Sequence, residues 1–252
     1  MKRALSERIA VITGASHPKG IGTAICRQLA RMGADIFFTY WQTDEDWPET
    51  LQNEIRGLGV RCESLGIDLS EPDAPFRLLD AVTEKWGIPS ILVNNAAHSA
   101  RDGYIALDAQ TLDAHYAVNV RAVCLLCVEF ARRFQQAHRS SGRIINMTSG
   151  QALGPMPGEL AYVATKGAIS AFTLSLAAEL APIGITVNAV NPGPTDTGWM
   201  TEEIKQKLLP KFSMGRIGLP EDAARLVAFL ASDEAEWITG QVIHSEGGFL
   251  RV

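Results

Sequence analysis

The sequence predicts an α/β fold, in which a doubly wound parallel sheet of about seven strands carries helices on both faces. Two observations predict this class. Short apolar, β-branched runs alternate along the chain with segments whose apolar residues recur at helical spacing. The chain has 252 residues, of which 46% are hydrophobic and 20% charged, and it shows no linker or short repeat. We therefore expect a single domain over residues 1–252.

The first half of the chain opens with a strand at Ile9–Thr13, which is apolar, β-branched and ended by Gly14. The helical pattern that follows begins at Ile21 and closes on Gly33, a residue favoured after helix ends. We expect further strands at 35–40, 60–67 and 90–95, and further helices at 44–58 and 72–86.

The second half begins with a helix-rich stretch from Thr111 to His138. We expect further strands at 142–149, 185–192 and 240–246, and further helices at 160–180 and 220–231. Residues 193–218 are polar and punctuated by Gly and Pro, with one helical piece near 202–209. We call residues 193–218 the covering segment, because we expect it to close over the substrate. A fixed contact between subunits is the alternative interpretation of its stretch from Trp199 to Phe212. In such sheets ligands bind at the carboxyl ends of the strands, so the residues just after strands carry the information.

Composition narrows the partners and the compartment. The net charge is −5 and there is no basic run, so we expect neither a nucleic-acid partner nor a membrane. No signal peptide is recognisable, and we expect no apolar run near the roughly 20 residues that span a bilayer. The four cysteines lack disulfide spacing, and Cys124 and Cys127 sit in an apolar helix, so we expect no metal site and a cytoplasmic location.

A Gly-rich turn, TGASHPKGIG, follows the first strand and is typical of a dinucleotide site. Gly14 can take the turn without a steric cost, and Gly20 and Gly22 let backbone and ligand approach closely. The helix that starts at Ile21 offers free N–H groups to a pyrophosphate. A tight turn without a ligand is the alternative interpretation of this motif alone.

The ends of the next strands indicate how the rest of a dinucleotide would bind. The second strand ends at Tyr40 without an acid for the ribose hydroxyls, since Asp44 and Glu45 come later. Ser16 and Lys19 lie in the Gly-rich turn, and Lys19 could meet a 2′-phosphate or be solvated. We therefore favour NADP(H) over NAD(H).

Two further strand ends complete the expected cofactor site. Asp68, followed by Leu69, could accept a hydrogen bond from the adenine or cap the next helix. Asn95 and Ala96 end the fourth strand and suit close approach to a ribose. His17 and His98 lie in loops that should face the same cleft.

Three side chains indicate the chemistry. Tyr162 and Lys166 are four apart on a predicted helix, and Ser149 ends the strand before it, so all three can converge at one edge of the sheet. Reducing a carbonyl with hydride places negative charge on oxygen, which needs a proton. A free tyrosine has a pKa of about 10, and a nearby ammonium should lower it. The Ser149 hydroxyl can hold the substrate oxygen, and Lys166 can also reach the nicotinamide ribose.

With these motifs together, the sequence resembles a short-chain dehydrogenase/reductase of the compact, single-domain type. Its closing stretch, GRIGLPEDAARLVAFLASDEAEWITGQVIHSEGG, is similar to that of the 3-oxoacyl-carrier-protein reductases. The resemblance implies a Rossmann-type fold, catalysis by Ser149, Tyr162 and Lys166, and a homotetramer. It further implies a water-mediated proton path supported by Asn119, and nicotinamide contacts from the segment that contains Pro192, Gly193 and Thr195.

The Gly-rich turn departs from the family pattern. Five residues separate Gly14 from Gly20, more than the family usually has, which is similar to the longer turn of the enoyl reductases. The spacing of Tyr162 and Lys166 is that of the carbonyl reductases. We therefore expect an NAD(P)-dependent oxidoreductase acting on a carbonyl or secondary alcohol, including 3-oxoacyl thioesters. Enoyl reduction and a non-catalytic NADP(H)-binding sensor are the alternatives. The apolar helices 118–130 and 169–180 indicate a homo-oligomer.

Overall fold

The computed structural model describes residues 3–44 and 46–251, which are arranged around one sheet of seven parallel strands. The strand order is β3-β2-β1-β4-β5-β6-β7, and every neighbouring pair is parallel. The strands are β1 (Ile9–Ile12), β2 (Asp35–Tyr40), β3 (Cys62–Gly66), β4 (Ile91–Asn94), β5 (Gly142–Met147), β6 (Ile185–Asn191) and β7 (Val242–His244). The Rossmann-type α/β fold expected from the sequence is confirmed.

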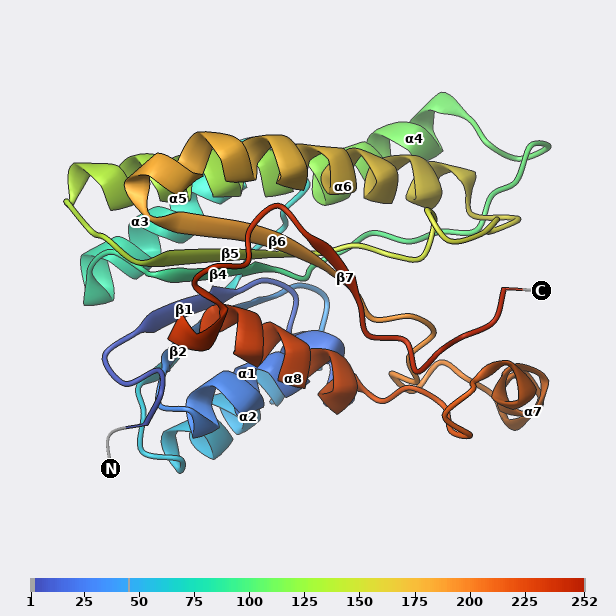
Figure 1. Ribbon diagram of the computed structural model, residues 1–252, viewed down its shortest axis with the longest axis horizontal. Coiled ribbons are helices and arrows are strands. Elements are labelled where there is room, and N and C mark those ends of the chain that lie inside the picture. Colours follow the sequence, from blue (N-terminus) through green and yellow to red (C-terminus); the bar gives the residue numbers. More distant parts are fainter. Residues whose placement is uncertain (1–2, 45, 252) are drawn as a thin grey trace.

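Helices cover both faces of the sheet (Figure 1). One layer contains α1 (Ile21–Arg31), α2 (Trp47–Arg56) and α8 (Pro220–Ala231). The other contains α3 (Ala74–Trp86), α4 (Ala109–Tyr116), the π-helical turn η1 (Ala117–Ala122), α5 (Val123–Gln136) and α6 (Leu160–Leu180). The remaining pieces are α7 (Glu202–Leu208) and the 3-10 turns η2 (Ala181–Ile183), η3 (Leu209–Lys211) and η4 (Asp233–Ala235).

The central strands β1 and β4 are almost entirely apolar because both of their faces are buried. In β1 all four residues are buried, and they alternate between two cores. Ala10 and Ile12 pack with the layer of α1 and α8, whereas Ile9 and Val11 pack with the layer of α3 and α5. The chain leaves β1 towards β2 and β3 and returns to β4 on the other side. The loops that follow β1 and β4 therefore lead in opposite directions at the carboxyl edge of the sheet. The gap between these two strands is the switch point of the fold.

The helix expected over 111–138 is three pieces, and tertiary contacts explain the difference. It begins earlier because the Asp108 carboxylate accepts a hydrogen bond from the Thr111 N–H at 2.8 Å and caps α4. It is interrupted by η1, where the buried side chain of Asn119 is hydrogen-bonded to the backbone of His98.

Two helical stretches, Ala109–Gln136 and Leu160–Ile183, are long and apolar enough to cross a membrane by length and composition, each with a mean hydropathy of 1.3. This goes beyond the sequence expectation. Their inner faces pack into the core, α5 against β4 and β5 and α6 against β6, which accounts for part of the apolarity. Less than half of each apolar window is buried, 44% and 39%, so an apolar outer surface remains on this layer.

Candidate active site

A cavity of about 770 Å³ lies at the carboxyl ends of β1, β2, β3 and β4. Nine of the residues expected to bind a dinucleotide line it: Gly14, Ser16, Gly20, Ile21, Tyr40, Asp68, Leu69, Asn95 and Ala96. Its other lining residues come from the same loops, from the layer of α4 and η1, and from the covering segment: His17, Thr39, Trp41, Gln42, Ile67, Ser70, Ala97, His98, Ala114, Val118 and Thr197. The cavity is therefore built where ligands bind in doubly wound sheets.

The Gly-rich turn has no room for side chains at two positions. Gly14 has φ +77°, and a Cβ on it would lie 2.7 Å from the Cα of Ala96. A Cβ on Gly22 would lie 2.4 Å from the carbonyl oxygen of Gly14. No side chain caps the N-terminus of α1, so its first N–H groups lack a capping side-chain acceptor. Close backbone packing and an uncapped helix N-terminus fit the pyrophosphate of a dinucleotide.

The extra residues of the turn are fastened to the loop after β2. The Ser16 hydroxyl accepts a hydrogen bond from the Trp41 N–H at 3.0 Å, and the Thr43 hydroxyl donates to the Ser16 carbonyl at 2.6 Å. The His17 carbonyl accepts from the Gly20 N–H at 2.9 Å, which closes the turn. The insertion thus forms one wall of the cavity at the end of β2.

Lys19 does not reach the cavity. It is exposed and does not line the cavity, and its neighbour across the turn is Gly198 in the covering segment. Among the lining residues the one carboxylate is Asp68, which accepts a hydrogen bond from the Ser70 N–H at 2.8 Å. The later acid Glu45 lies outside the described residues.

Asn95 joins the ends of β1 and β4. Its side-chain amide donates to the carbonyl oxygens of Thr13 and Gly14, both at 2.9 Å, and the Thr13 hydroxyl accepts from the N–H groups of Asn95 and Ala96, both at 3.0 Å. The amide that we expected beside a ribose therefore holds the switch point together, and Gly14 is pressed against Ala96 as a result.

Ser149, Tyr162 and Lys166 converge beyond the end of β5. The Ser149 hydroxyl donates a hydrogen bond to the Met156 sulfur at 3.8 Å, and it lies close enough to the Tyr162 phenol to act against the rise in the pKa of that phenol. The Lys166 Nζ lies 5.4 Å from the centre of the Tyr162 ring and donates to the Met147 carbonyl at 2.8 Å. Helix α6 supplies the tyrosine and the lysine from one face, and β5 leads directly into the serine.

Burial controls the titration of this group. It raises the pKa of Tyr162 to about 12, aided by the Glu159 carboxylate and opposed by the Ser149 hydrogen bond. It lowers the pKa of Lys166 to about 8, because a buried ammonium is poorly solvated. The structure thus differs from the lowered tyrosine pKa expected from the sequence, since desolvation of the phenol raises this pKa.

Asn119 is buried in η1, and its side chain is occupied by the protein. Its amide donates to the His98 carbonyl at 2.8 Å and to the Thr165 hydroxyl at 3.1 Å, and its oxygen accepts from the His98 N–H at 2.7 Å. Thr165 precedes Lys166 on α6. These contacts tie the loop after β4 to the catalytic helix.

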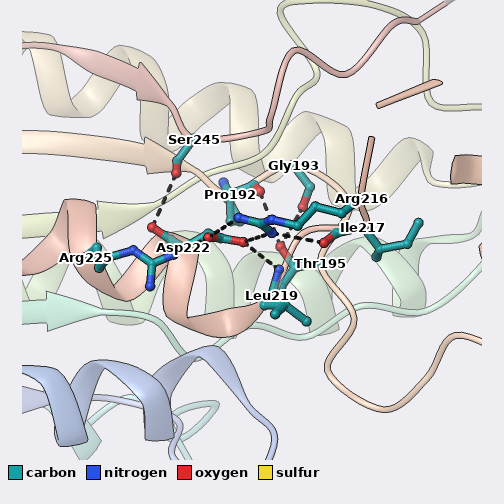
Figure 2. A network of polar contacts seen from close by, with 9 residues as sticks. All are labelled: Pro192, Gly193, Thr195, Arg216, Ile217, Leu219, Asp222, Arg225 and Ser245. Carbon is teal, nitrogen blue, oxygen red and sulfur yellow. Dashed lines mark hydrogen bonds and ion pairs between the residues drawn. The ribbon is translucent and has the colours of Figure 1, made fainter. Parts of the chain in front are cut away.

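Of the segment after β6, Thr197 lines the cavity, whereas Pro192, Gly193 and Thr195 do not. Pro192, Gly193 and Thr195 form a compact turn, in which the buried Thr195 hydroxyl donates to the carbonyls of Gly193 and Pro192 at 3.2 and 3.3 Å. Figure 2 shows this turn beside an ion network around Asp222 at the start of α8.

The Asp222 network fixes the distal end of the covering segment. The Asp222 carboxylate accepts two hydrogen bonds from Arg216, at 2.6 and 2.7 Å, one from the Leu219 N–H at 2.9 Å, and one from Arg225 (Figure 2). The cationic neighbours, Arg216 first, hold the pKa of Asp222 down to about 2. Because Thr195 also pairs with Gly218, the two ends of the covering segment are held side by side.

Sequence reasoning missed the side chain that caps the catalytic helix. Asp102, in the loop after β4, accepts hydrogen bonds from the Leu160 and Ala161 N–H groups at 2.7 and 2.8 Å. These bonds, led by that from Ala161, lower the pKa of Asp102. The carboxylate lies far from α6 in sequence, so no local capping pattern could reveal it. The lining residues Trp41, Gln42 and Thr197 were also missed, although the first two follow a strand.

Comparisons with known proteins agree with this geometry. A family model described as enoyl-(acyl carrier protein) reductase matches residues 14–250. An uncharacterized oxidoreductase YjdA from Bacillus subtilis is 68% identical over 245 residues, covering 97% of this chain and 98% of that protein. The 3-oxoacyl-acyl-carrier-protein reductase FabG from Staphylococcus aureus is 36% identical over 242 residues, covering 95% and 96%. A solved variant of a Serratia marcescens short-chain dehydrogenase/reductase superposes with a TM-score of 0.89 at 34% identity, covering 98% and 99%.

The chain belongs to the short-chain dehydrogenase/reductase family and is an oxidoreductase. Membership implies a nicotinamide cofactor and a small-molecule substrate. The cavity, the crowded glycines and the uncapped helix N-terminus fit a dinucleotide.

Proposed function

We propose that this enzyme transfers hydride between a nicotinamide dinucleotide and a carbonyl or secondary alcohol, with Tyr162 as the proton donor. The convergence of Ser149, Tyr162 and Lys166 beyond β5 carries the proposal. A non-catalytic sensor has no need of a hydroxyl pair beside a buried lysine. Burying the lysine ammonium costs folding stability, and a sensor would gain nothing in return. Turnover of NADPH with ketones and thioesters tests the proposal.

The dinucleotide would supply the hydride for reduction, and the chain supplies the rest. The Ser149 hydroxyl donates a hydrogen bond to the substrate oxygen, and Tyr162 gives that oxygen a proton as negative charge builds on it. Lys166 would hold the ribose of the bound dinucleotide and would stabilise the phenolate that remains. Asn119 acts through its contacts with Thr165 and the His98 backbone, which set the position of α6.

The titration of the site favours reduction near neutral pH. With a pKa of about 12, Tyr162 keeps its proton and can donate it. Alcohol oxidation needs the phenolate, so it should gain rate as the pH rises. Lys166, with a pKa of about 8, keeps its charge below that pH and can offset the phenolate.

We favour NADP(H) as the cofactor. The end of β2 presents Tyr40, Trp41 and Gln42 to the cavity, without a carboxylate that would bind ribose hydroxyls and repel a 2′-phosphate. The exposed Lys19 would contribute a positive field from outside the cavity. Dissociation constants for NADPH and NADH, measured by quenching of tryptophan fluorescence, decide between them. Tighter binding of NADH would overturn this choice.

The reaction class is tested by two thioesters that differ in the bond reduced. We propose 3-oxoacyl thioesters among the substrates, because FabG is a named relative over nearly the whole chain. The family model's description and the long Gly-rich turn favour enoyl reduction as the second candidate. NADPH oxidation with an acetoacetyl thioester but not a crotonyl thioester supports carbonyl reduction, and the reverse result establishes enoyl reduction.

We propose that the 252 residues act as one catalytic domain, with the covering segment closing over the substrate. The ends of this segment are held by the Thr195–Gly218 pairing and by Asp222, so that its middle, including α7, can move as a unit.

We also propose a homo-oligomer, a tetramer by family resemblance, located in the cytoplasm. The outer face of α6 exposes a stripe of small apolar residues, Ala164, Ala168, Ala171 and Ala178, flanked by Leu174 at 63% exposure. Such a stripe suits close packing against a helix of a second copy. All four cysteines are free thiols, which is typical of a reducing compartment.

A further inference from the structure

The C-terminal tail, residues 245–251, runs beside the candidate active site. It contains an almost buried ion pair, in which Arg251 donates to both carboxylate oxygens of Glu246, at 2.8 and 2.6 Å. The two side chains are only 14% and 11% exposed. Two-point pairing of this kind fixes orientation as well as distance.

Arg251 lies against the loop between β5 and α6, residues 148–159, which begins with the candidate catalytic Ser149. A Cβ on Gly150 would meet the Arg251 Nη2 at 2.0 Å, and one on Gly154 would meet the Arg251 Cδ at 2.8 Å. The arginine side chain therefore crosses two positions that lack side chains, one of them directly after Ser149. The guanidinium also lies 5.3 Å from the centre of the Phe249 ring.

Glu246 lies against the loop after β6. A Cβ on Gly193 would meet the Glu246 Cβ at 2.3 Å, and the carboxylate accepts a hydrogen bond from the Asn191 side chain at 2.8 Å. Burial alone would raise the pKa of Glu246, but hydrogen bonds from Arg251 and Asn191 hold this pKa below its usual value. The pair therefore connects the loop after β5 with the loop after β6.

The same tail is bonded to the covering segment. The Leu250 N–H donates to the Lys211 carbonyl at 2.8 Å, the Met214 N–H donates to the Gly247 carbonyl at 3.2 Å, and the Phe212 and Phe249 rings lie 5.0 Å apart. The covering segment cannot leave its place without pulling on the residues between Glu246 and Arg251.

We propose that the Arg251–Glu246 pair is a latch, in which Arg251 is a positioning residue that couples closure of the covering segment to the geometry of the Ser149 loop. This inference rests on the proposed carbonyl chemistry for its kinetic consequence. When the segment is closed, the tail presses Arg251 across Gly150 and holds Ser149 towards Tyr162. When the latch is broken, the segment opens more often and Ser149 loses its place.

The test compares Arg251→Gln, Arg251→Lys and the control Arg61→Gln. Arg61 also donates two hydrogen bonds to a carboxylate, both to one oxygen of Asp35, at 2.9 and 2.7 Å, and the pair lies at the amino end of β2, away from the site. Each protein is digested with a lysine-specific endoproteinase, which reports opening through cleavage after Lys205 and Lys207, and is assayed for KM, kcat and NADPH binding.

We expect Arg251→Gln to raise the rate of cleavage within the covering segment about tenfold, because local opening sets that rate. We expect KM for the carbonyl substrate to rise more than kcat falls, with NADPH binding unchanged. Arg251→Lys should lie between the wild type and Arg251→Gln, and Arg61→Gln should match the wild type. Wild-type cleavage and KM in Arg251→Gln, or equal changes in Arg61→Gln, would overturn the latch. If the wild type reduces no carbonyl, the proposed function is wrong, but the cleavage rates still test the latch.

Discussion

At the scale of single residues, the site places a phenol that keeps its proton beside an ammonium that loses its proton more readily than usual. Burial raises the pKa of Tyr162 to about 12 and lowers that of Lys166 to about 8. In the stable state of this buried pair, Tyr162 is a neutral phenol and Lys166 is an ammonium that can still lose its proton. Both pKa shifts favour the neutral forms of Tyr162 and Lys166. The site therefore acts on the charge that develops during the reaction and not on charge that is present beforehand.

The pH dependence of reduction follows from Lys166. Its lowered pKa means that the ammonium is present below pH 8 and lost above it. We therefore expect kcat/KM for ketone reduction to be flat at lower pH and to fall with a midpoint near 8, because the phenolate left on Tyr162 loses its positive neighbour. A rate profile measured from pH 6 to 10 checks this, and a rate that rises through pH 8 would contradict it.

The packing of the Gly-rich turn predicts a selective loss of cofactor binding. In Gly14→Ala the new methyl would lie 2.7 Å from the Ala96 Cα, which must displace the loop after β4. Gly87→Ala is the matched control, because Gly87 also has a positive φ, +90°, but open space around it. Both should lose about 1–2 kcal/mol to backbone strain. By titration calorimetry only Gly14→Ala should bind NADPH more than tenfold weaker, and equal affinity in the two variants would refute this account.

At the scale of elements, the catalytic helix is held from outside its own sequence. Asp102 caps α6, and Asn119 connects it through Thr165 to the loop after β4. The position of Tyr162 thus depends on a neighbouring loop as much as on its own helix. Helix α6 itself could be predicted from apolar spacing, whereas these long-range contacts could not, because local patterns carry no information on partners that distant.

Removing the α6 cap should affect catalysis as well as stability. In Asp102→Ala the Leu160 and Ala161 N–H groups lose their acceptor, so the first turn of α6 frays and Tyr162 moves. Asp108→Ala is the control, since Asp108 caps α4. We expect both to lower the Tm by a few degrees, and only Asp102→Ala to lower kcat several-fold. Equal kcat values would show that the cap has no role in placing Tyr162.

At the scale of the whole molecule, the sequence predicted the sheet and the location of the site. Each buried strand is a short apolar run, and the carboxyl ends of such strands meet at one edge, so residues such as Asp68 and Asn95 could be placed there. Lys19 is exposed and does not line the cavity, because contacts of Ser16 with Trp41 and Thr43 orient the inserted turn. The tail latch and the π-helical turn depend on tertiary contacts that have no local signal.

The exposed stripe on α6 predicts association of whole chains. Ala171→Glu places a charge in the middle of the stripe, where a second copy would bury it without a partner. We expect this variant to shift to a smaller assembly in sedimentation velocity. Asn53→Glu on the exposed face of α2 should leave the assembly unchanged. A wild-type chain that sediments as a monomer would refute the oligomer.

The role of Tyr162 is tested most directly by comparing the wild type with Tyr162→Phe, using NADPH oxidation with an acetoacetyl thioester and a panel of ketones. The variant keeps the ring and loses the donated proton, so the account predicts at least a hundredfold lower kcat, the usual scale for a positioned acid. Its affinity for NADPH should be unchanged. Undiminished ketone reduction by Tyr162→Phe would contradict the assignment of Tyr162 as the proton donor.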